Sequence, residues 1–372
     1  MKNLPCSHIA PIMCTIPPHV RSVDMVVSWA GVPTLEREQA RVRYLSYQAN
    51  GGSRVPPPID VQQHRFTYNG ELPILIRRAF AYGSHWMRNL HIIMPDECVF
   101  PNEIIRDALG DMYETLRVRI HIHRDSSILP RDALPVFNSH PKEANLDRIP
   151  GLSEQFVYAN DDMFLNQTTP AEFFFSSTDG RPRYRGNTRE PGCMDRDRNH
   201  ACIGQHGNHV YQNIQHNTAS LFWTASSKCR SRTQKHTYVN VDHQMKALTR
   251  SGYRRARALF PDAFAKLTHT RFRSIDDFSP TVLIPNLELA SGLATLDTDP
   301  PRSHEVYLEL TILPTVQRNL MIIRGCLQRC YLLCVNNGCE DWHGPWLTKH
   351  FDIPSSYLHH AVMHPSGSDA CM

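Results

Sequence analysis

The chain has 372 residues, of which 41% are hydrophobic and 20% charged, and its formal net charge is +4. This composition excludes an intrinsically disordered chain and is typical of a globular protein with a sizeable core, in one large or two ordinary domains. The mild positive charge does not indicate a nucleic-acid partner, but it would suit an anionic substrate. No stretch approaches the roughly 18 apolar residues of a membrane span, and the Pro-rich start is a poor signal peptide. We therefore expect a soluble protein, or one whose targeting and anchoring parts lie outside this chain.

The first half of the chain alternates between predicted strands and helices. Residues 1–22 are Pro-rich and expected to be poorly ordered, and residues 23–29 (VDMVVSW) form an apolar, β-branched run that predicts a core strand. Further runs predict helices over 35–48 and 72–82, and strands over 90–94, 118–123 and 155–159. This order predicts an α/β fold with a mainly parallel, Rossmann-like sheet flanked by helices.

The second half is less regular. Residues 175–216 are rich in Gly, Arg, Asn, Asp and His and predict a loop-rich insertion, more typical of a solvated loop than of a phosphate clamp. Residues 242–257 and 286–293 predict helices, so we expect a largely helical C-terminal half. Cys326, Cys330 and Cys334 share one face if their segment is helical. Because the chain has no C-x-x-C pair, we expect buried thiols here rather than a zinc ribbon. A disulfide among these cysteines is the alternative in an oxidising compartment.

The most informative pattern is Asn160-Asp161-Asp162, which directly follows the apolar run 155–159. In open α/β sheets, ligands bind where strands leave the core. Two neighbouring carboxylates repel each other unless a metal ion or a cationic group compensates their charge. An Asp-rich turn is the alternative interpretation. We favour a functional site at this position.

Four blocks of the sequence carry a family resemblance. The strongest runs from Leu134 to Asp162 and reads LPVFNSHPKEANLDRIPGLSEQFVYANDD. The others are the strand Asp24–Trp29, the pair Phe260-Pro261 with an Arg and an Asp beyond it, and a weaker block at 334–358. Together with residues 71–77 and 86–93, these blocks resemble the Stealth family of hexose-1-phosphate transferases, in a single domain over 23–358 with a tail at 359–372.

The resemblance implies a GT-A-like fold and the transfer of a sugar-1-phosphate from a nucleotide sugar, such as UDP-GlcNAc, to a hydroxyl of a glycan or polysaccharide acceptor. The nucleotide would leave as its monophosphate, and Mg²⁺ or Mn²⁺ would assist. Relatives act in the Golgi lumen in eukaryotes and in the cytoplasm in bacteria. A metal-dependent nucleotide-sugar glycosyltransferase and a non-catalytic glycan-binding member remain the alternatives.

The resemblance and the needs of phosphoryl transfer also assign roles. Asp162 is the expected base, Asp161 the metal or hydrogen-bonding partner, and Arg273 the phosphate clamp. His243 is the expected family histidine, with His236 as the fallback. The other expected site residues are, for substrate, Asp24, Trp29, Arg77, Asn138, Ser139, His140, Glu143, Arg148, Asn160 and Asp277, and, for metal, Asn336.

Some of these residues have structural alternatives, and the chain departs from the family pattern. Trp29 would equally suit the core, and Glu143 with Arg148 would suit a structural ion pair. The segment 30–34 lacks the usual acid, and Asn336-Asn337 stands where Asn-Asp is usual. Because of these departures, a divergent or inactive enzyme remains an alternative.

Overall fold

The computed structural model describes residues 23–32, 34–49, 68, 70–189, 209–228, 238–241, 244–297, 305–310 and 332–337. Its central sheet has five strands in the order β3-β2-β1-β4-β9. These are β1 (Val23–Ser28), β2 (Met87–Met94), β3 (Ile120–Arg124), β4 (Gln155–Asn160) and β9 (Lys246–Thr249). The first four pair in parallel, and β9 runs antiparallel to β4. The predicted mainly parallel, Rossmann-like sheet is therefore confirmed.

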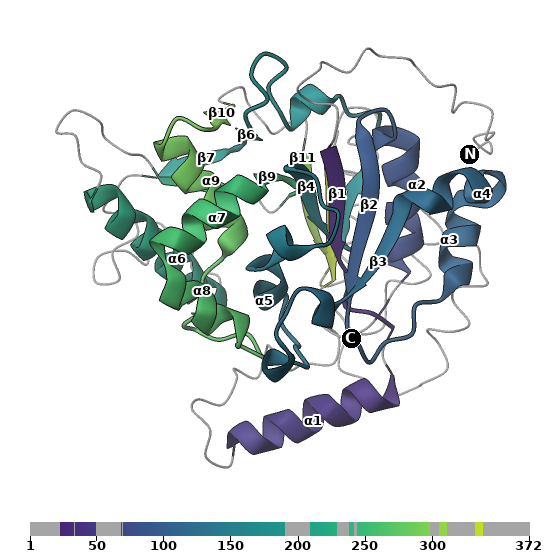
Figure 1. The fold of residues 1–372 in the computed structure, drawn as a ribbon, viewed down its shortest axis with the longest axis horizontal. Coiled ribbons are helices and arrows are strands. Elements are labelled where there is room, and N and C mark those ends of the chain that lie inside the picture. Colours follow the sequence, from purple (N-terminus) through teal and green to yellow (C-terminus); the bar gives the residue numbers. More distant parts are fainter. Residues whose placement is uncertain are drawn as a thin grey trace.

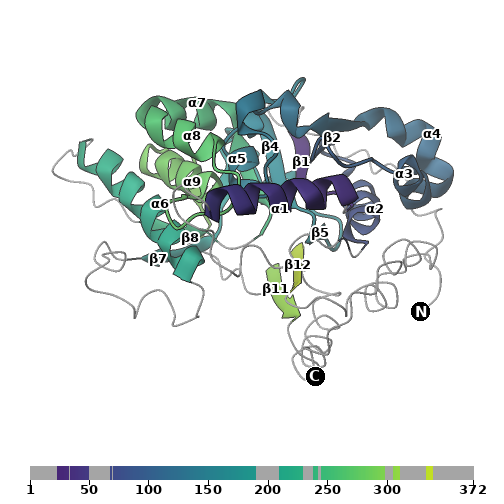
Figure 2. The same ribbon diagram turned by 90° about the horizontal axis from the view of Figure 1, so that it is seen from below.

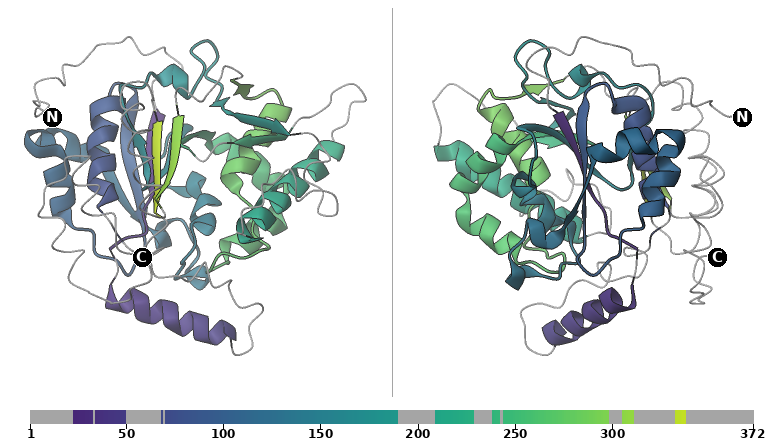
Figure 3. Two further views of the ribbon diagram at one scale, coloured as in Figure 1. Left: turned by 180° about the vertical axis from the view of Figure 1, so that it is seen from behind. Right: turned by 45° about the vertical axis from the view of Figure 1, so that its right-hand side comes forward.

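Helices cover both faces of this sheet (Figures 1 and 3). On one side lie α2 (Glu71–Gly83) and α3 (Asn102–Leu109), followed by the short α4 (Tyr113–Leu116). On the other side lie α5 (Ser139–Glu143), α7 (Arg250–Leu259), α8 (Pro261–Thr268) and α9 (Pro280–Ala290), and α6 (His209–Lys228) packs on α9. The remaining helix, α1 (Leu35–Ala49), runs across the molecule at the end where the chain leaves β1 (Figures 1 and 2).

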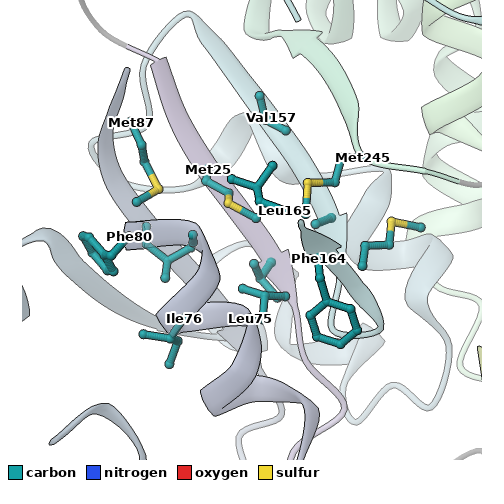
Figure 4. Close-up of a cluster of buried hydrophobic side chains, with 14 of the residues drawn as sticks. Met25, Leu75, Ile76, Phe80, Met87, Val157, Phe164, Leu165 and Met245 are labelled. Carbon is teal, nitrogen blue, oxygen red and sulfur yellow. The ribbon is translucent and has the colours of Figure 1, made fainter. Parts of the chain in front are cut away.

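Two apolar cores form because successive side chains of a strand point to opposite faces. Met25 and Val27 of β1 belong to the core under α2, whereas Val26 belongs to the core under α5, α7, α8 and α9. All six residues of β1 are buried, which explains its almost continuous apolar sequence. Figure 4 shows the first core, where Met25 lies among Leu75 and Phe80 of α2.

A second, three-stranded sheet lies against the first core. It consists of β5 (Met163–Leu165), β12 (Leu332–Asn337) and β11 (Glu305–Leu310), with β12 parallel to β11 and antiparallel to β5. Leu332 and Cys334 of β12 are buried in that core. This sheet brings a segment from the far end of the sequence directly beside the residues that follow Asp162.

Short pairings complete the described part of the chain. β6 (Arg183–Tyr184) pairs with β10 (Thr295–Leu296), and β7 (Gly186–Arg189) pairs with β8 (Tyr238–Val241). The expected insertion at 175–216 therefore contributes β6, β7 and the start of α6, and its residues 190–208 lie outside the described chain. None of the helices in the described ranges has the length and apolar character needed to cross a membrane.

The structure corrects some predicted elements. The predicted helix over 242–257 is wrong at its start, because residues 246–249 form β9 and only α7 is helical. Thr249 ends that strand and caps the helix, since its hydroxyl accepts the Gly252 N–H at 2.9 Å. The strand expected from residue 118 begins at Ile120, and the helix expected over 286–293 is α9. The C-terminal half holds the predicted helices but also seven short strands among its described residues, β6 to β12.

The cysteine prediction is confirmed in one part. Cys334 is a buried thiol, in a strand rather than a helix. Cys326 and Cys330 lie outside the described residues. The division of the chain into a single domain over 23–358 stays a prediction.

Candidate functional site

The acid pair lies where the strand order of the central sheet reverses. From β1 the chain adds β2 and β3 on one side and then crosses to place β4 on the other, so the carboxyl ends of β1 and β4 flank this switch point. Such points form the ligand crevice of open α/β sheets. Asp161 and Asp162 follow β4 directly, and the Ala30 N–H, just beyond β1, donates to Asp161 Oδ2 at 3.4 Å. The sheet therefore holds the acids at its expected binding edge.

The two carboxyl groups have different surroundings. The thiol of Cys334 donates to Asp162 Oδ2 at 3.6 Å, whereas Asp162 Oδ1 is buried without a hydrogen-bond partner among the described residues. Burial, followed by the negative charge of Asp161, raises the pKa of Asp162 to about 7. Burial also raises the pKa of Asp161, although the Ala30 N–H and the charge of Lys142 oppose that shift. A group with a pKa near neutrality is well suited to accept a proton.

Two buried lysines near the acid pair were missed in the sequence. Lys142 of α5 is 4% exposed, and its Nζ lies 3.2 Å from Oδ1 of the buried Asp125, which follows β3. Lys246, at the start of β9, is 9% exposed, and its charge lowers the pKa of the Cys334 thiol, which burial nonetheless keeps high. The charge of Lys142 acts on Asp161, and that of Lys246 acts on Cys334, the thiol partner of Asp162. The only sequence signal was a lysine inside an otherwise apolar or motif-bearing stretch.

A second cluster gathers three of the expected site residues around one carboxylate. Asp277 Oδ2 accepts a hydrogen bond from Asn138 Nδ2 at 2.9 Å and from the Ser274 N–H at 3.1 Å, and it lies 3.1 Å from His140 Nδ1. Asn138 also caps α5, because its Oδ1 accepts the His140 N–H at 3.1 Å. Arg273, half-buried, immediately precedes Ser274. Asp277 thus fixes the backbone beside Arg273 against the start of α5, which begins at Ser139.

A buried polar chain connects α5 and α9 to the strand that carries the acid pair. The Tyr158 hydroxyl donates to Asn160 Oδ1 at 2.9 Å and lies 3.4 Å from Glu143 Oε1. The Thr281 hydroxyl lies 3.5 Å from Glu143 Oε2. Glu143 therefore faces the end of β4, and it does not form the alternative ion pair with Arg148, whose side chain is exposed. This chain links Glu143 to Asn160, the residue before Asp161.

Four expected site residues lie away from the acid pair or make structural contacts. Asp24 sits at the start of β1, at the opposite end from the acid pair. Trp29 is 1% exposed and packs edge-on against the rings of Tyr68 and Phe100. Arg77 donates to backbone carbonyls at the end of α3, and Arg148 is exposed seven residues before β4. The structure does not bring these side chains to the acid pair, so their predicted substrate contacts stay predictions.

Asp24 has a network of its own. Arg88 grips both carboxylate oxygens, at 2.9 and 2.6 Å, and Oδ2 also accepts the Ser153 N–H at 2.7 Å and lies 3.2 Å from His91 Nε2. Although burial acts to raise it, these bonds hold the pKa of Asp24 well below its usual range. His123 extends the network, at 2.9 Å from His91. The strand-one Asp of the family resemblance is here the centre of a buried ion-pair network.

For three expected site residues, the described chain gives no side-chain contact with the acid pair. His236 and His243 lie outside the described residues. Asn336 is described only as part of β12, two residues beyond Cys334, which pairs with Met163 of β5. Its position in the strand is compatible with the predicted approach to the acid pair, which stays untested.

The acid pair partly fits a divalent cation. In the described part of the chain, no three His, Cys, Asp or Glu side chains converge on a metal position. However, Asp162 Oδ1 is buried and lacks a partner among these residues, beside a second carboxyl group. Mg²⁺ commonly binds through one or two carboxylates, substrate phosphates and water. Asp161 would therefore hold such an ion beside Asp162, together with a phosphorylated substrate.

The comparison with known families matches the resemblance seen in the sequence. Residues 65–182 match the family description "Stealth protein CR2, conserved region 2", a range that includes Asn138, Asp161 and Asp162. This match supports the Stealth resemblance over the matched region. The matched region spans α2 to the strand β5, and so includes the acid pair and the start of the Asp277 cluster.

Curated relatives extend the similarity beyond this region. The chain is 26% identical to an exopolysaccharide phosphotransferase of Streptomyces coelicolor, over 94% of this chain and 61% of that protein. It is 27% identical to a capsular polysaccharide phosphotransferase of Neisseria meningitidis serogroup A, over 91% and 57%. An exopolysaccharide phosphotransferase of Lactiplantibacillus plantarum is 42% identical over 28% of each chain. The chain therefore spans about half the length of such relatives.

Solved structures give only loose matches to this chain. The galactosyltransferase LgtC, in complex with donor and acceptor sugar analogues, superposes with a TM-score of 0.40 and 7% identity, over 81% of this chain and 94% of that one. The apo form of mouse xyloside xylosyltransferase 1 superposes with a TM-score of 0.33 and 9% identity, over 84% and 97%.

Proposed function

We propose that this protein transfers a sugar-1-phosphate from a nucleotide sugar to a hydroxyl of a glycan or polysaccharide acceptor. The observation that carries the proposal is the acid pair at the switch point of the sheet, in which burial and Asp161 raise the pKa of Asp162 to about 7. The names of the relatives support a phosphotransferase acting on polysaccharide. The nucleotide sugar as donor, such as UDP-GlcNAc, is part of the proposal.

In the proposed reaction, the acceptor hydroxyl oxygen attacks the donor phosphorus nearest the sugar. The new P–O bond forms as the bond from that phosphorus to the bridging diphosphate oxygen breaks, and the nucleotide leaves as its monophosphate. Asp162 takes the hydroxyl proton, because a buried carboxylate with a pKa near 7 is a much stronger base than an exposed one. The sugar and the acceptor end joined through a phosphodiester.

The other residues would bind and orient the diphosphate. Arg273 carries a fixed, planar positive charge that can hold two phosphoryl oxygens at once. Asn138, His140 and Asp277 hold the segment that carries Arg273 against α5. His243, or His236 in its place, is the proposed group that stabilises or protonates the leaving phosphate.

A divalent ion such as Mg²⁺ would, when bound, neutralise charge on the phosphoryl oxygens. Asp161 would hold it, with Asn336 as the proposed second protein ligand, while Asp162 acts as the base. The charge of Lys142 already offsets part of the negative charge of Asp161, so we expect weak binding of the divalent ion in the absence of the donor.

The test is incubation with a panel of nucleotide sugars, an oligosaccharide acceptor and Mg²⁺ or Mn²⁺, followed by chromatography of the released nucleotide. Nucleoside monophosphate together with a phosphodiester-linked product is the expected result. Release of nucleoside diphosphate would mean that the sugar moves without its phosphate, as in a glycosyltransferase. Donor binding without any release would identify a non-catalytic member. Either outcome would overturn the proposal.

Variants make this experiment specific to the acid pair. Asp162→Asn should abolish monophosphate release, because an amide cannot accept the proton. Asp111→Asn is the matched control, since Asp111 is an exposed acid beyond α3. Full activity of Asp162→Asn would reject the base assignment.

A further inference from the structure

Two segments that are far apart in the sequence are joined beside the site by a pair of stacked rings. Phe137 and Phe272 lie with their ring centroids 5.0 Å apart and their planes 15° from parallel. The Phe137 N–H also donates to the carbonyl of Arg271 at 2.7 Å. Asn138 follows the first ring and Arg273 follows the second. The stack therefore fixes the distance between the segments that carry these two site residues.

Helix α1 covers this stack. Ala40, Tyr44 and Leu45 pack against the two rings, which form a small apolar cluster separate from both main cores. The guanidinium of Arg271 lies 4.7 Å from the centre of the Tyr44 ring. Figure 2 shows α1 running lengthwise across the end of the molecule to which β1 leads. One face of α1 thus packs against the Phe137–Phe272 stack rather than against the core of the sheet.

Arg37 fastens α1 to the first of the two segments. It is 5% exposed, its guanidinium lies 4.9 Å from the centre of the Phe137 ring, and it donates to the Val136 carbonyl at 3.0 Å. Its second amino group forms an ion pair with Glu97, at 3.0 Å. Only an arginine can make the ring contact and both polar contacts from one flat group. Glu97 follows β2, so Arg37 ties the end of the sheet to this loop.

The beginning of α1 lies close in the sequence to the loop that contacts the acid pair. The Arg37 N–H donates to the Thr34 hydroxyl at 3.1 Å, which caps the first turn. Thr34 lies four residues after Ala30, whose N–H donates to Asp161. A short stretch of chain therefore connects the contact on the acid pair to the residue that holds the Phe137 ring.

We propose that Arg37 is a positioning residue for Arg273, acting through the stacked rings of Phe137 and Phe272. The inference rests on the proposed function, because it takes Arg273 as the group that binds the donor phosphate. A phosphate-binding group displaced by about 1 Å can slow a reaction by about a hundredfold. Arg37 touches no substrate in this scheme; it determines where the Arg273 guanidinium lies.

The experiment is a double-mutant cycle on the full chain, scored as kcat/KM for the nucleotide-sugar donor. Arg37→Met should lower kcat/KM about 10- to 100-fold in the otherwise native chain but less than about threefold when Arg273→Lys is already present. The control Arg43→Met removes an exposed charge from the same helix and should change kcat/KM less than twofold. Equal losses in both backgrounds would show a merely structural role and overturn the proposal.

A second variant guards against misfolding. Arg37→Lys keeps the charge but loses the planar contact with Phe137. We expect its melting temperature to lie within a few degrees of the native value, and its kcat/KM to show most of the loss seen in Arg37→Met. Full activity of a folded Arg37→Lys would contradict the proposal, as would equal activity of folded Arg37→Met.

Hydrogen exchange separates this inference from the proposed function. If no donor gives turnover, the proposed function fails while the positioning contact can still be measured. In Arg37→Met, peptides covering 134–140 and 270–275 should exchange faster than in the native chain, because the Phe137–Arg271 hydrogen bond opens more often. Peptides covering α7 should not change. Native exchange rates in both segments would refute the contact itself.

Discussion

The buried acid pair makes a strong prediction about stability as well as activity. The pKa of Asp162 is raised from 3.8 to about 7, chiefly by burial. Each pKa unit is worth about 1.4 kcal/mol, so the shift corresponds to about 4 kcal/mol of folding free energy. Well below pH 3.8 the carboxyl is protonated in both the folded and the unfolded chain, so its contribution to stability is fully present. As the pH rises towards 7 the unfolded chain loses its proton first, and the metal-free protein loses up to this amount of stability.

Replacing Asp162 by Asn removes this titration. The free energy of unfolding of the native chain should fall between pH 4.5 and 7.5 more steeply than that of Asp162→Asn, by up to about 1.4 kcal/mol per pH unit. At pH 8 the variant should therefore be the more stable protein, although it has no turnover. Loss of the weak thiol bond from Cys334 is a much smaller effect.

Urea unfolding at several pH values in EDTA measures this difference. Asp111→Asn, an exposed acid, is the control and should follow the native curve. Added Mn²⁺ and nucleotide sugar should make the free energy of unfolding of the native chain fall less steeply with pH, because a bound cation favours the ionised carboxylates. Parallel curves for the native chain and Asp162→Asn would refute the raised pKa, and with it the electrostatic basis of the base assignment.

Three further predictions concern the frame of the site. Asp24→Asn should cost about 3 kcal/mol in urea unfolding at pH 7 because a buried ion pair is broken, and the native chain should lose that contribution as the pH falls below 4, since the pKa of Asp24 is lowered. Lys142→Met should cost about 3–5 kcal/mol by leaving buried Asp125 unpaired, and should lower the Mn²⁺ concentration that half-saturates turnover; Lys142→Arg should do neither. Gly31→Ala should lower the melting temperature by several degrees, because φ is +83° there and the new Cβ would meet the Cys98 sulfur at 2.4 Å.

The sequence predicted the central strands β1 and β4 because they are buried on both faces. Such strands read as unbroken apolar runs, and the acid pair stands out because it ends one of them. The antiparallel strand β9 could not be predicted in the same way. Lys246 and Leu248 suit a helix as well as a strand, and only pairing with β4 decides between them. The strands β11 and β12 owe their pairing to partners that no local pattern reveals.

The contacts within the site were also not predictable from local sequence patterns. Asn138, His140 and Asp277 were predicted as separate candidates, but their shared bond network depends on contacts between residues 139 and 137 positions apart. The Lys142–Asp125 ion pair was missed because neither residue follows a pattern along the sequence. Asp24 was expected near the nucleotide, and the structure gives it Arg88 as its main partner. Motif membership alone does not distinguish a buried structural acid from a reacting one.

The different surroundings of the two neighbouring acids explain how one pair could serve two roles. Asp161 accepts the Ala30 N–H and lies within the field of Lys142, and both favour its ionised form. Asp162 accepts a thiol hydrogen bond and keeps an oxygen without a partner in the described chain, and burial and the charge of Asp161 raise its pKa to about 7. An enzyme that must hold a cation and accept a proton at one corner needs this asymmetry. The asymmetry arises because Asp161 faces the loop after β1, whereas Asp162 faces β12 from the far end of the chain.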